Sequence, residues 1–260
     1  MKNNLELFSL KKKKIVLTGC SGFLGIEFKN YLLKSGAIVI GIDLKQNKKK
    51  KLKNFYFYQS DFTDVKSIKN ICQQINKKFK KIDCLINNAA VNEPLEKNLN
   101  KNFLNFNLEE FDKFSDINIK AILHLCKYFH KSLKKAEGSI INIGSIYGLV
   151  SPDQKMYNHN NKFNNQKNIS YTITKSALIG LTKHLAVIFS KDKIRVNSTS
   201  FGGIENEQPK SFLKKYSNNT PMNRMAKKNE FNGVINFLIS DASSYVTGSN
   251  IIVDGGLTIV

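Results

Sequence analysis

The chain has 260 residues, of which 41% are hydrophobic and 10% aromatic, so it is long and apolar enough for one large α/β domain. It has no apolar run of about 18 residues or more, and residues 1–14 contain no apolar segment, which predicts neither a membrane span nor a secretory signal. We therefore expect a cytoplasmic protein.

The formal net charge of +21 comes almost entirely from lysine, because arginine occurs only as Arg195 and Arg224. A basic chain can bind a polyanion such as nucleic acid or an acidic carrier protein. Proteins that bind nucleic acid usually rely on arginine, however, and this chain is also rich in Asn, Ile, Phe and Tyr, which share A/T-rich codons. The composition favours codon bias, and we expect no specific nucleic-acid partner.

Four cysteines are scattered along the chain as Cys20, Cys72, Cys84 and Cys126. No pair has the CxxC spacing of a metal site, and a cytosolic protein of this size needs no disulfide. We expect reduced thiols and no bound metal.

A glycine-rich turn follows the first apolar run. Residues 15–17 predict a buried strand, residues 18–25 contain three glycines, and Leu24, Phe28 and Leu32 then recur at helical spacing. Glycines at a strand-to-helix turn let backbone amides approach a pyrophosphate, which the positive end of the helix also attracts. The turn therefore predicts a nucleotide-binding site.

The second predicted strand, residues 37–42, ends at Asp43, 24 residues after Gly19. A carboxylate at this position accepts hydrogen bonds from an adenosine ribose and repels a 2′-phosphate. Asp43 therefore favours NAD over NADP. Lys45 and the lysine run at 48–51 could instead attract a phosphate, although such runs are more often solvated.

The rest of the chain alternates strands with helices. We expect strands at 55–59, 82–86, 139–143, 194–198 and 250–253, and helices at 64–79, 111–134, 171–189 and 230–239. Asn118 falls inside a predicted helix, where an amide is unfavourable unless it has a specific role. The alternation predicts a single-domain, Rossmann-type doubly wound parallel sheet, with helices on both faces, over residues 1–260.

Three segments lie outside this pattern. Residues 1–13 are a basic lead-in, residues 151–169 are an Asn-rich insertion loop, and residues 205–221 are polar and expected to be a mobile lid over substrate.

Tyr171 and Lys175 are four residues apart, which stacks their side chains on one face of a helix. An ammonium beside a phenol favours the phenolate, so we expect the Tyr171 pKa to be lowered toward neutrality. Such a tyrosine can donate a proton to a carbonyl oxygen or remove one from an alcohol.

Five blocks together resemble the short-chain dehydrogenase/reductase family, and they occur in that family's order. They are residues 18–25, 87–90, 144–145, 171–175 and 254–256. The segments at 221–226 and 245–248 are similar to the tetramer-forming branch. The resemblance implies an NAD(P)-dependent oxidoreductase of a small molecule, assembled as a homotetramer or homodimer.

The resemblance also assigns roles to individual residues. It implies that Tyr171 is the acid/base, that Lys175 lowers its pKa and binds the nicotinamide ribose, and that Ser145 polarises the substrate oxygen. Asn118 would hold a water for proton relay. The implied cofactor-binding residues are Gly19, Ser21, Gly22, Phe23, Leu24, Gly25, Asp43, Asp61, Phe62, Asn88, Ala89, Ala90, Tyr171, Lys175, Gly202 and Ile204.

The sequence departs from the family pattern in two places. Ser145 and Tyr171 are 26 residues apart, about twice the usual spacing, and Phe201-Gly202 stands where the family often has Pro-Gly. The insertion and residues 202–213 resemble relatives from flagellin and surface-sugar modification, which implies a sugar substrate in nonulosonic acid-type biosynthesis. The alternative enzyme is a 3-oxoacyl-carrier-protein reductase. The alternative without enzyme activity is a nucleotide-sensing or nucleic-acid-binding Rossmann protein.

Overall fold

The computed structural model describes residues 4–46, 52–92, 103–157 and 166–260. These residues form a parallel seven-stranded sheet in the order β3-β2-β1-β4-β5-β6-β7. The strands are β1 Lys14–Thr18, β2 Ile38–Asp43, β3 Phe55–Gln59, β4 Cys84–Asn87, β5 Ser139–Ser145, β6 Arg195–Phe201 and β7 Asn250–Val253. The predicted doubly wound sheet is confirmed, and the strand order reverses between β1 and β4.

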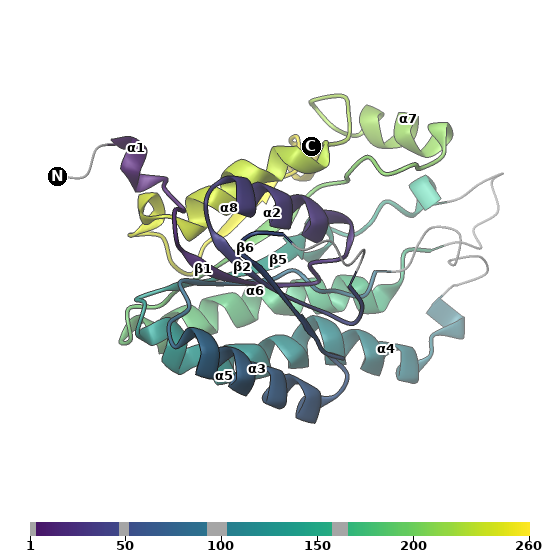
Figure 1. Cartoon of the computed structure of the whole chain (residues 1–260). Helices are drawn as coiled ribbons and strands as arrows, with labels where there is room; N and C mark the ends of the chain where they lie inside the picture. The colour runs from purple at the N-terminus through teal and green to yellow at the C-terminus, as the bar shows by residue number, and fades with distance from the viewer. Residues whose placement is uncertain (1–3, 47–51, 93–102, 158–165) are drawn as a thin grey trace.

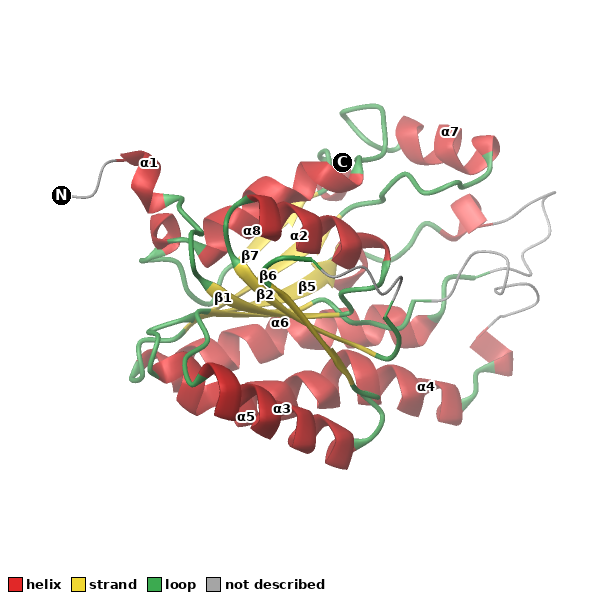
Figure 2. Cartoon of the chain, in the orientation of Figure 1, coloured by secondary structure: helices red, strands yellow, loops and turns green. Residues whose placement is uncertain are grey.

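Helices cover both faces of the sheet (Figure 1; Figure 2). One face carries α2 Phe23–Lys34 and α8 Asn232–Ile239, and the other carries α3 Val65–Phe79, α5 Ala121–Lys134 and α6 Ile169–Ser190. Shorter helices, α1 Asn4–Leu7, α4 Leu108–Ser115 and α7 Lys210–Asn218, lie around this core.

Strand β1 shows how the sequence specifies the two faces. Ile15 and Leu17 pack with α2 and α8, whereas Val16 points to the opposite face and packs with α3. All three side chains are fully buried. Parallel strands covered on both faces usually contain continuous apolar runs, which is why this run predicted the strand correctly.

The helix expected at 111–134 is interrupted. α4 ends at Ser115, a wide π-helical turn occupies Asp116–Lys120, and α5 starts at Ala121. Asn118 sits in this turn and is 1% exposed. A π-turn frees its backbone from regular helical pairing, and such turns often occur at functional sites.

The segment at 205–221 contains a helix that the sequence analysis did not predict. In α7, Phe212 and Tyr216 are one turn apart and both buried, so the helix packs against the molecule through an apolar edge. Within the insertion, Gln154–Tyr157 forms a short 3₁₀ turn, α6 already begins at Ile169, and residues 158–165 lie outside the described residues.

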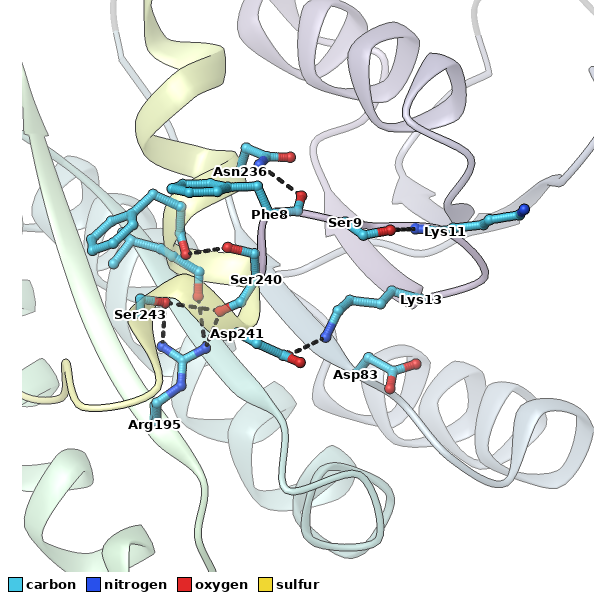
Figure 3. Close-up of polar contacts among 12 residues, drawn as sticks. Phe8, Ser9, Lys11, Lys13, Asp83, Arg195, Asn236, Ser240, Asp241 and Ser243 are labelled. Atoms are coloured by element: carbon cyan, nitrogen blue, oxygen red, sulfur yellow. Dashed lines mark hydrogen bonds and ion pairs between the residues drawn. The ribbon is translucent and has the colours of Figure 1, made fainter. Parts of the chain in front are cut away.

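Arg195 ties β6 to the end of α8 (Figure 3). Its guanidinium donates hydrogen bonds to the carbonyl oxygens of Leu238 at 3.0 Å and Ser240 at 3.3 Å, and to Ser243 Oγ at 2.8 Å. A cation there satisfies the carbonyls that a helix C-terminus leaves unpaired.

We expect Arg195→Met to lower the free energy of unfolding by about 3 kcal/mol, because it removes several charge-assisted bonds from partly buried carbonyls. Urea denaturation measures this. The control is Lys13→Met, which breaks the partly exposed Lys13–Asp241 ion pair of 3.0 Å and should cost under about 1 kcal/mol. Equal losses in the two variants would contradict the assignment of Arg195 as a fold anchor.

Candidate active site

A cavity of about 1170 Å³ lies at the carboxyl ends of the strands. Every residue that the sequence analysis assigned to cofactor binding lines it, namely Gly19, Ser21, Gly22, Phe23, Leu24, Gly25, Asp43, Asp61, Phe62, Asn88, Ala89, Ala90, Tyr171, Lys175, Gly202 and Ile204. Ser145 also lines it, whereas Asn118 does not. The cavity spans the point where the strand order reverses, which is the usual ligand position in doubly wound sheets.

The glycine-rich turn is packed too tightly for side chains at two positions. Gly19 has φ +65°, and a Cβ there would lie 2.8 Å from Ala89 Cα. A Cβ on Gly25 would lie 1.9 Å from the carbonyl oxygen of Gly19. α2 starts with no side-chain cap, so backbone N–H groups remain at its N-terminus beside the cavity. The turn forms a cradle that suits a phosphate group.

Asp43 is fixed at the edge of this cradle. Its Oδ2 accepts a hydrogen bond from the backbone N–H of Ser21 at 2.8 Å, and its Oδ1 accepts one from Leu44 N–H at 2.7 Å. The carboxylate therefore has a defined position in the cavity wall. Lys45 lines the same wall, and the lysines at 48–51 lie outside the described residues.

Asn88 holds the end of β4 against the glycine-rich turn. Its Nδ2 donates to the carbonyl oxygens of Thr18 at 3.0 Å and Gly19 at 3.2 Å. Thr18 Oγ1 in turn accepts from the backbone N–H groups of Asn88 and Ala89, each at 3.0 Å. Asn88 thus shapes the cavity floor.

On the adjoining wall, hydrogen bonds from Thr63 lower the pKa of Asp61, which stays ionised.

Ser145, Tyr171 and Lys175 come together at the end of β5. The Ser145 hydroxyl lies near enough to Tyr171 to lower the pKa of its phenol. Lys175 Nζ lies 5.6 Å from the centroid of the Tyr171 ring and donates a 2.8 Å hydrogen bond to the carbonyl oxygen of Ile143. Although Ser145 and Tyr171 are 26 residues apart in the sequence, both line the same cavity.

The pKa of Tyr171 moves opposite to the sequence-based expectation. Burial raises the pKa of the phenol, and the nearby Ser145 hydroxyl offsets this only in part. Burial also lowers the pKa of Lys175 to about 8. Desolvation outweighs charge attraction here because Lys175 is directed to the Ile143 carbonyl. Tyr171 therefore carries its proton at neutral pH.

The buried Asn118 side chain organises the wall next to this group. Its Oδ1 accepts from Val91 N–H at 2.8 Å, and its Nδ2 donates to Val91 O at 3.3 Å and to Thr174 Oγ1 at 3.1 Å. The amide thus links the segment after β4 to the helix that carries Tyr171. Its water-holding role stays a prediction.

An aromatic wall that the sequence analysis missed faces Tyr171. It consists of Tyr147, Tyr157, Phe212 and Tyr216, which all line the cavity. The hydroxyl oxygens of Tyr147 and Tyr157 are 2.7 Å apart, in hydrogen-bond contact. The spacing of Phe212 and Tyr216 is a helical signal that could have revealed one part of this wall, whereas Tyr157 comes from the irregular insertion and has no comparable signal.

A family model described as Enoyl-(Acyl carrier protein) reductase matches residues 25–258, which is most of the chain. The chain belongs to the short-chain dehydrogenase/reductase family. The predicted family membership, the Rossmann-type sheet and the assignment as an oxidoreductase are confirmed.

Several members of the family resemble this chain over nearly its full length. The 3-oxoacyl-[acyl-carrier-protein] reductase FabG of Buchnera aphidicola is 31% identical, with 97% of this chain and 100% of the relative covered. Post-translational flagellin modification protein A of Campylobacter coli is 28% identical, with 95% and 98% covered. A short-chain dehydrogenase of Leptospira borgpetersenii, solved with bound NAD+, superposes with a TM-score of 0.88 at 32% identity, covering 99% of this chain and 97% of that one.

In the part of the chain that the structure describes, no helix is both long enough and apolar enough to cross a bilayer.

Proposed function

We propose that this short-chain dehydrogenase/reductase transfers a hydride between NAD(H) and the carbon of a secondary alcohol or ketone on a hydroxylated small molecule, with Tyr171 exchanging the proton. The observation that carries the proposal is one continuous cavity that joins the glycine-rich cradle to Ser145, Tyr171 and Lys175. The substrate we propose is a sugar of a surface-glycan pathway of the nonulosonic acid type.

The residues present fit a dinucleotide. Gly19 and Gly25 leave space that a Cβ would fill, so the turn can hold the pyrophosphate against the N-terminus of α2. Asp43 would bind the adenosine ribose, Asp61 and Phe62 would flank the adenine, and Lys175 would bind the nicotinamide ribose. The nicotinamide, when bound, would supply or accept the hydride.

Ser145 and Tyr171 would act on the oxygen of the substrate. The Ser145 hydroxyl, which lines the same cavity as Tyr171, would hold the substrate oxygen beside the phenol. Because burial raises the pKa of Tyr171, the phenol is protonated and ready to protonate a ketone oxygen during reduction. In the oxidation direction, the phenol would first have to release its proton to solvent, and the phenolate oxygen would then take the proton from the alcohol.

The preference for NAD is a prediction about Asp43. We expect wild-type protein to favour NAD(H) over NADP(H), and Asp43→Asn to reduce that preference about tenfold, because the fixed carboxylate repels a 2′-phosphate. Titration of both reduced cofactors, followed by nicotinamide fluorescence, measures this. Asp64→Asn is the control, since Asp64 caps α3 and does not line the cavity. An unchanged cofactor ratio in Asp43→Asn would contradict the assignment.

The substrate end of the cavity supports a hydroxylated ligand. The hydroxyl groups of Tyr147 and Tyr157 offer hydrogen bonds, while the aromatic faces offer apolar contact. The resemblance to the flagellin modification protein of Campylobacter coli also supports a surface-sugar substrate. The α7 segment, residues 205–221, would close over the bound sugar.

The second candidate is reduction of a 3-oxoacyl group on a carrier protein. The 31% identity to the Buchnera FabG favours it, and the net charge of +21 suits an acidic carrier. Two panels distinguish the candidates by nicotinamide absorbance: sugar phosphates with nucleotide sugars, and acyl thioesters. Turnover of a sugar with NAD(H) supports the first proposal, and turnover of thioesters alone would replace it with the second.

We also propose a homotetramer or homodimer that works in the cytoplasm. Val187 on α6 is 76% exposed and Tyr245 is fully exposed, and such large apolar side chains are commonly covered in an assembly. Sedimentation velocity distinguishes these states from a monomer.

A further inference from the structure

Two buried tyrosines, Tyr147 and Tyr157, form a hydroxyl pair at the substrate end of the cavity. Their hydroxyl oxygens are 2.7 Å apart, and either can be the donor. Both residues line the cavity, although they are only 8% and 6% exposed. Each phenol carries one proton, and the hydrogen bond between them uses one of the two. This tyrosine pair therefore keeps a second O–H donor together with lone pairs that can accept.

The second proton is buried with the pair. In the described part of the chain, neither hydroxyl oxygen has a hydrogen bond outside the pair. Leaving a buried hydroxyl proton unpaired is costly, so the pair favours a ligand that accepts from it. Burial also raises the pKa of both phenols, so that the pair stays neutral and keeps both of its protons at neutral pH.

The tyrosine pair lies beside the groups that would hold the reacting oxygen. Tyr147 is in the 3₁₀ turn Ile146–Gly148, directly after β5, and its backbone N–H donates a hydrogen bond to Ser145 Oγ at 3.2 Å. Tyr171 packs against the cluster that contains both members of the pair. Any group that the pair binds must therefore be close to the reacting carbon.

Tyr157 comes from the insertion, which holds it against α7. It ends the 3₁₀ turn Gln154–Tyr157, and its ring meets Phe212 of α7 edge-on, with the ring centroids 5.8 Å apart. Asp153 Oδ2 accepts a hydrogen bond from Asn219 Nδ2, at the end of α7, at 3.3 Å. The insertion thus supplies one half of the pair in a fixed position.

We propose that the tyrosine pair binds a second hydroxyl group of the substrate, beside the reacting carbon, so that the enzyme selects hydroxy ketones and the corresponding diols. This inference rests on the proposed function and deepens it, because Ser145 and Tyr171 mark the reacting oxygen. A hydroxyl fits the pair because it can accept the free proton and also donate to a lone pair. The carbonyl of a thioester can only accept, so it matches the pair less completely.

The test compares kcat/KM for ketones with and without a hydroxyl next to the carbonyl, using NADH and following its absorbance. The pairs are hydroxyacetone with acetone, 3-hydroxybutan-2-one with butan-2-one, and 2-hydroxycyclohexanone with cyclohexanone. We expect wild type to favour at least one hydroxy ketone more than about tenfold over its match, because the plain ketone leaves the buried donor unpaired.

The double variant Tyr147→Phe/Tyr157→Phe removes both hydroxyls and keeps both rings. It should lower the preference about tenfold, and comparison with wild type cancels the intrinsic difference in reactivity between the two ketones. Replacing both partners of a buried hydrogen bond by apolar groups of the same shape is nearly neutral for stability. We therefore expect an unchanged melting temperature and NADH affinity. If the double variant does not fold, Tyr157→Phe alone should lower the preference about threefold.

Phe212→Leu is the matched control. It removes the ring that packs on Tyr157 without removing a hydroxyl, so it should weaken the reaction of both ketones alike and keep their ratio. An equal change of the ratio in this variant would assign the preference to packing and overturn the proposal.

No preference for the hydroxy ketone in any pair would overturn the proposal, as would a preference that the double variant retains in full. Turnover of plain ketones or of thioesters without this preference would leave hydride transfer standing while this inference fails. Failure to bind NADH would instead refute the proposed function. Binding of NADH without turnover of any ketone, in these pairs or in the sugar and thioester panels, would refute both.

Discussion

Replacing Tyr171 with phenylalanine is expected to lower kcat about 1000-fold, while the affinity for NADH stays within about twofold of wild type. We propose that the phenol exchanges a proton with the substrate oxygen, and Ser145 lies near enough to lower the pKa of this phenol. The aromatic ring remains in the variant, so Lys167 and Lys175 keep their contacts with it. Steady-state turnover and NADH fluorescence titration give the two values.

Tyr58→Phe is the matched control, because Tyr58 is a half-buried tyrosine on β3 that does not line the cavity. It should turn over substrate like wild type. If Tyr171→Phe kept more than about a tenth of wild-type kcat, the acid/base assignment would be wrong.

Gly25→Ala is expected to lower the free energy of unfolding by more than about 4 kcal/mol, or to prevent folding. The added Cβ would lie 1.9 Å from Gly19 O, 2.8 Å from Gly19 C and 2.9 Å from Cys20 Cα. All three atoms belong to the backbone, so no flexible side chain can move aside. Relief requires α2 to move away from the turn, which would also open the nucleotide cradle. Urea denaturation and NADH titration report the two effects.

Gly180→Ala makes the same change in α6, where a Cβ meets no atom within 4 Å. It should stabilise the protein by about 0.5–1 kcal/mol, because alanine favours helix more than glycine does. Equal behaviour of Gly25→Ala and Gly180→Ala would mean that the tight contact at Gly25 is not required.

The parts of the fold predicted correctly are those with a strong local cause. Strand β1 is apolar at its three central positions, 15–17, because both faces of the sheet are covered there. The glycine-rich turn also carries its own signal, since Gly19 adopts a positive φ and Gly25 allows close contact. Asp64 caps α3 through Lys66 N–H at 2.8 Å, as its position before the helix predicted.

The features that escaped prediction depend on contacts distant in sequence. The π-turn at Asn118 is tied to Val91 and Thr174, on two other segments of the chain. The Tyr171 pKa depends on burial, which the four-residue spacing to Lys175 does not reveal. Lys167 lies at the site with its ammonium hydrogen-bonded to Asn92, 75 residues away in the sequence, and a polar irregular segment carries no periodic signal for such a contact.

Transfer of deuterium from NADH labelled at the reactive nicotinamide carbon tests the central claim most directly. Wild-type protein would be incubated with labelled NADH and the ketones of the sugar and thioester panels, and the products would be analysed by mass spectrometry. We expect wild type to form an alcohol with deuterium on the former carbonyl carbon, and Tyr171→Phe to form it about 1000-fold more slowly. A protein that binds NADH yet forms no labelled alcohol from any ketone would contradict the claim that this cavity catalyses hydride transfer.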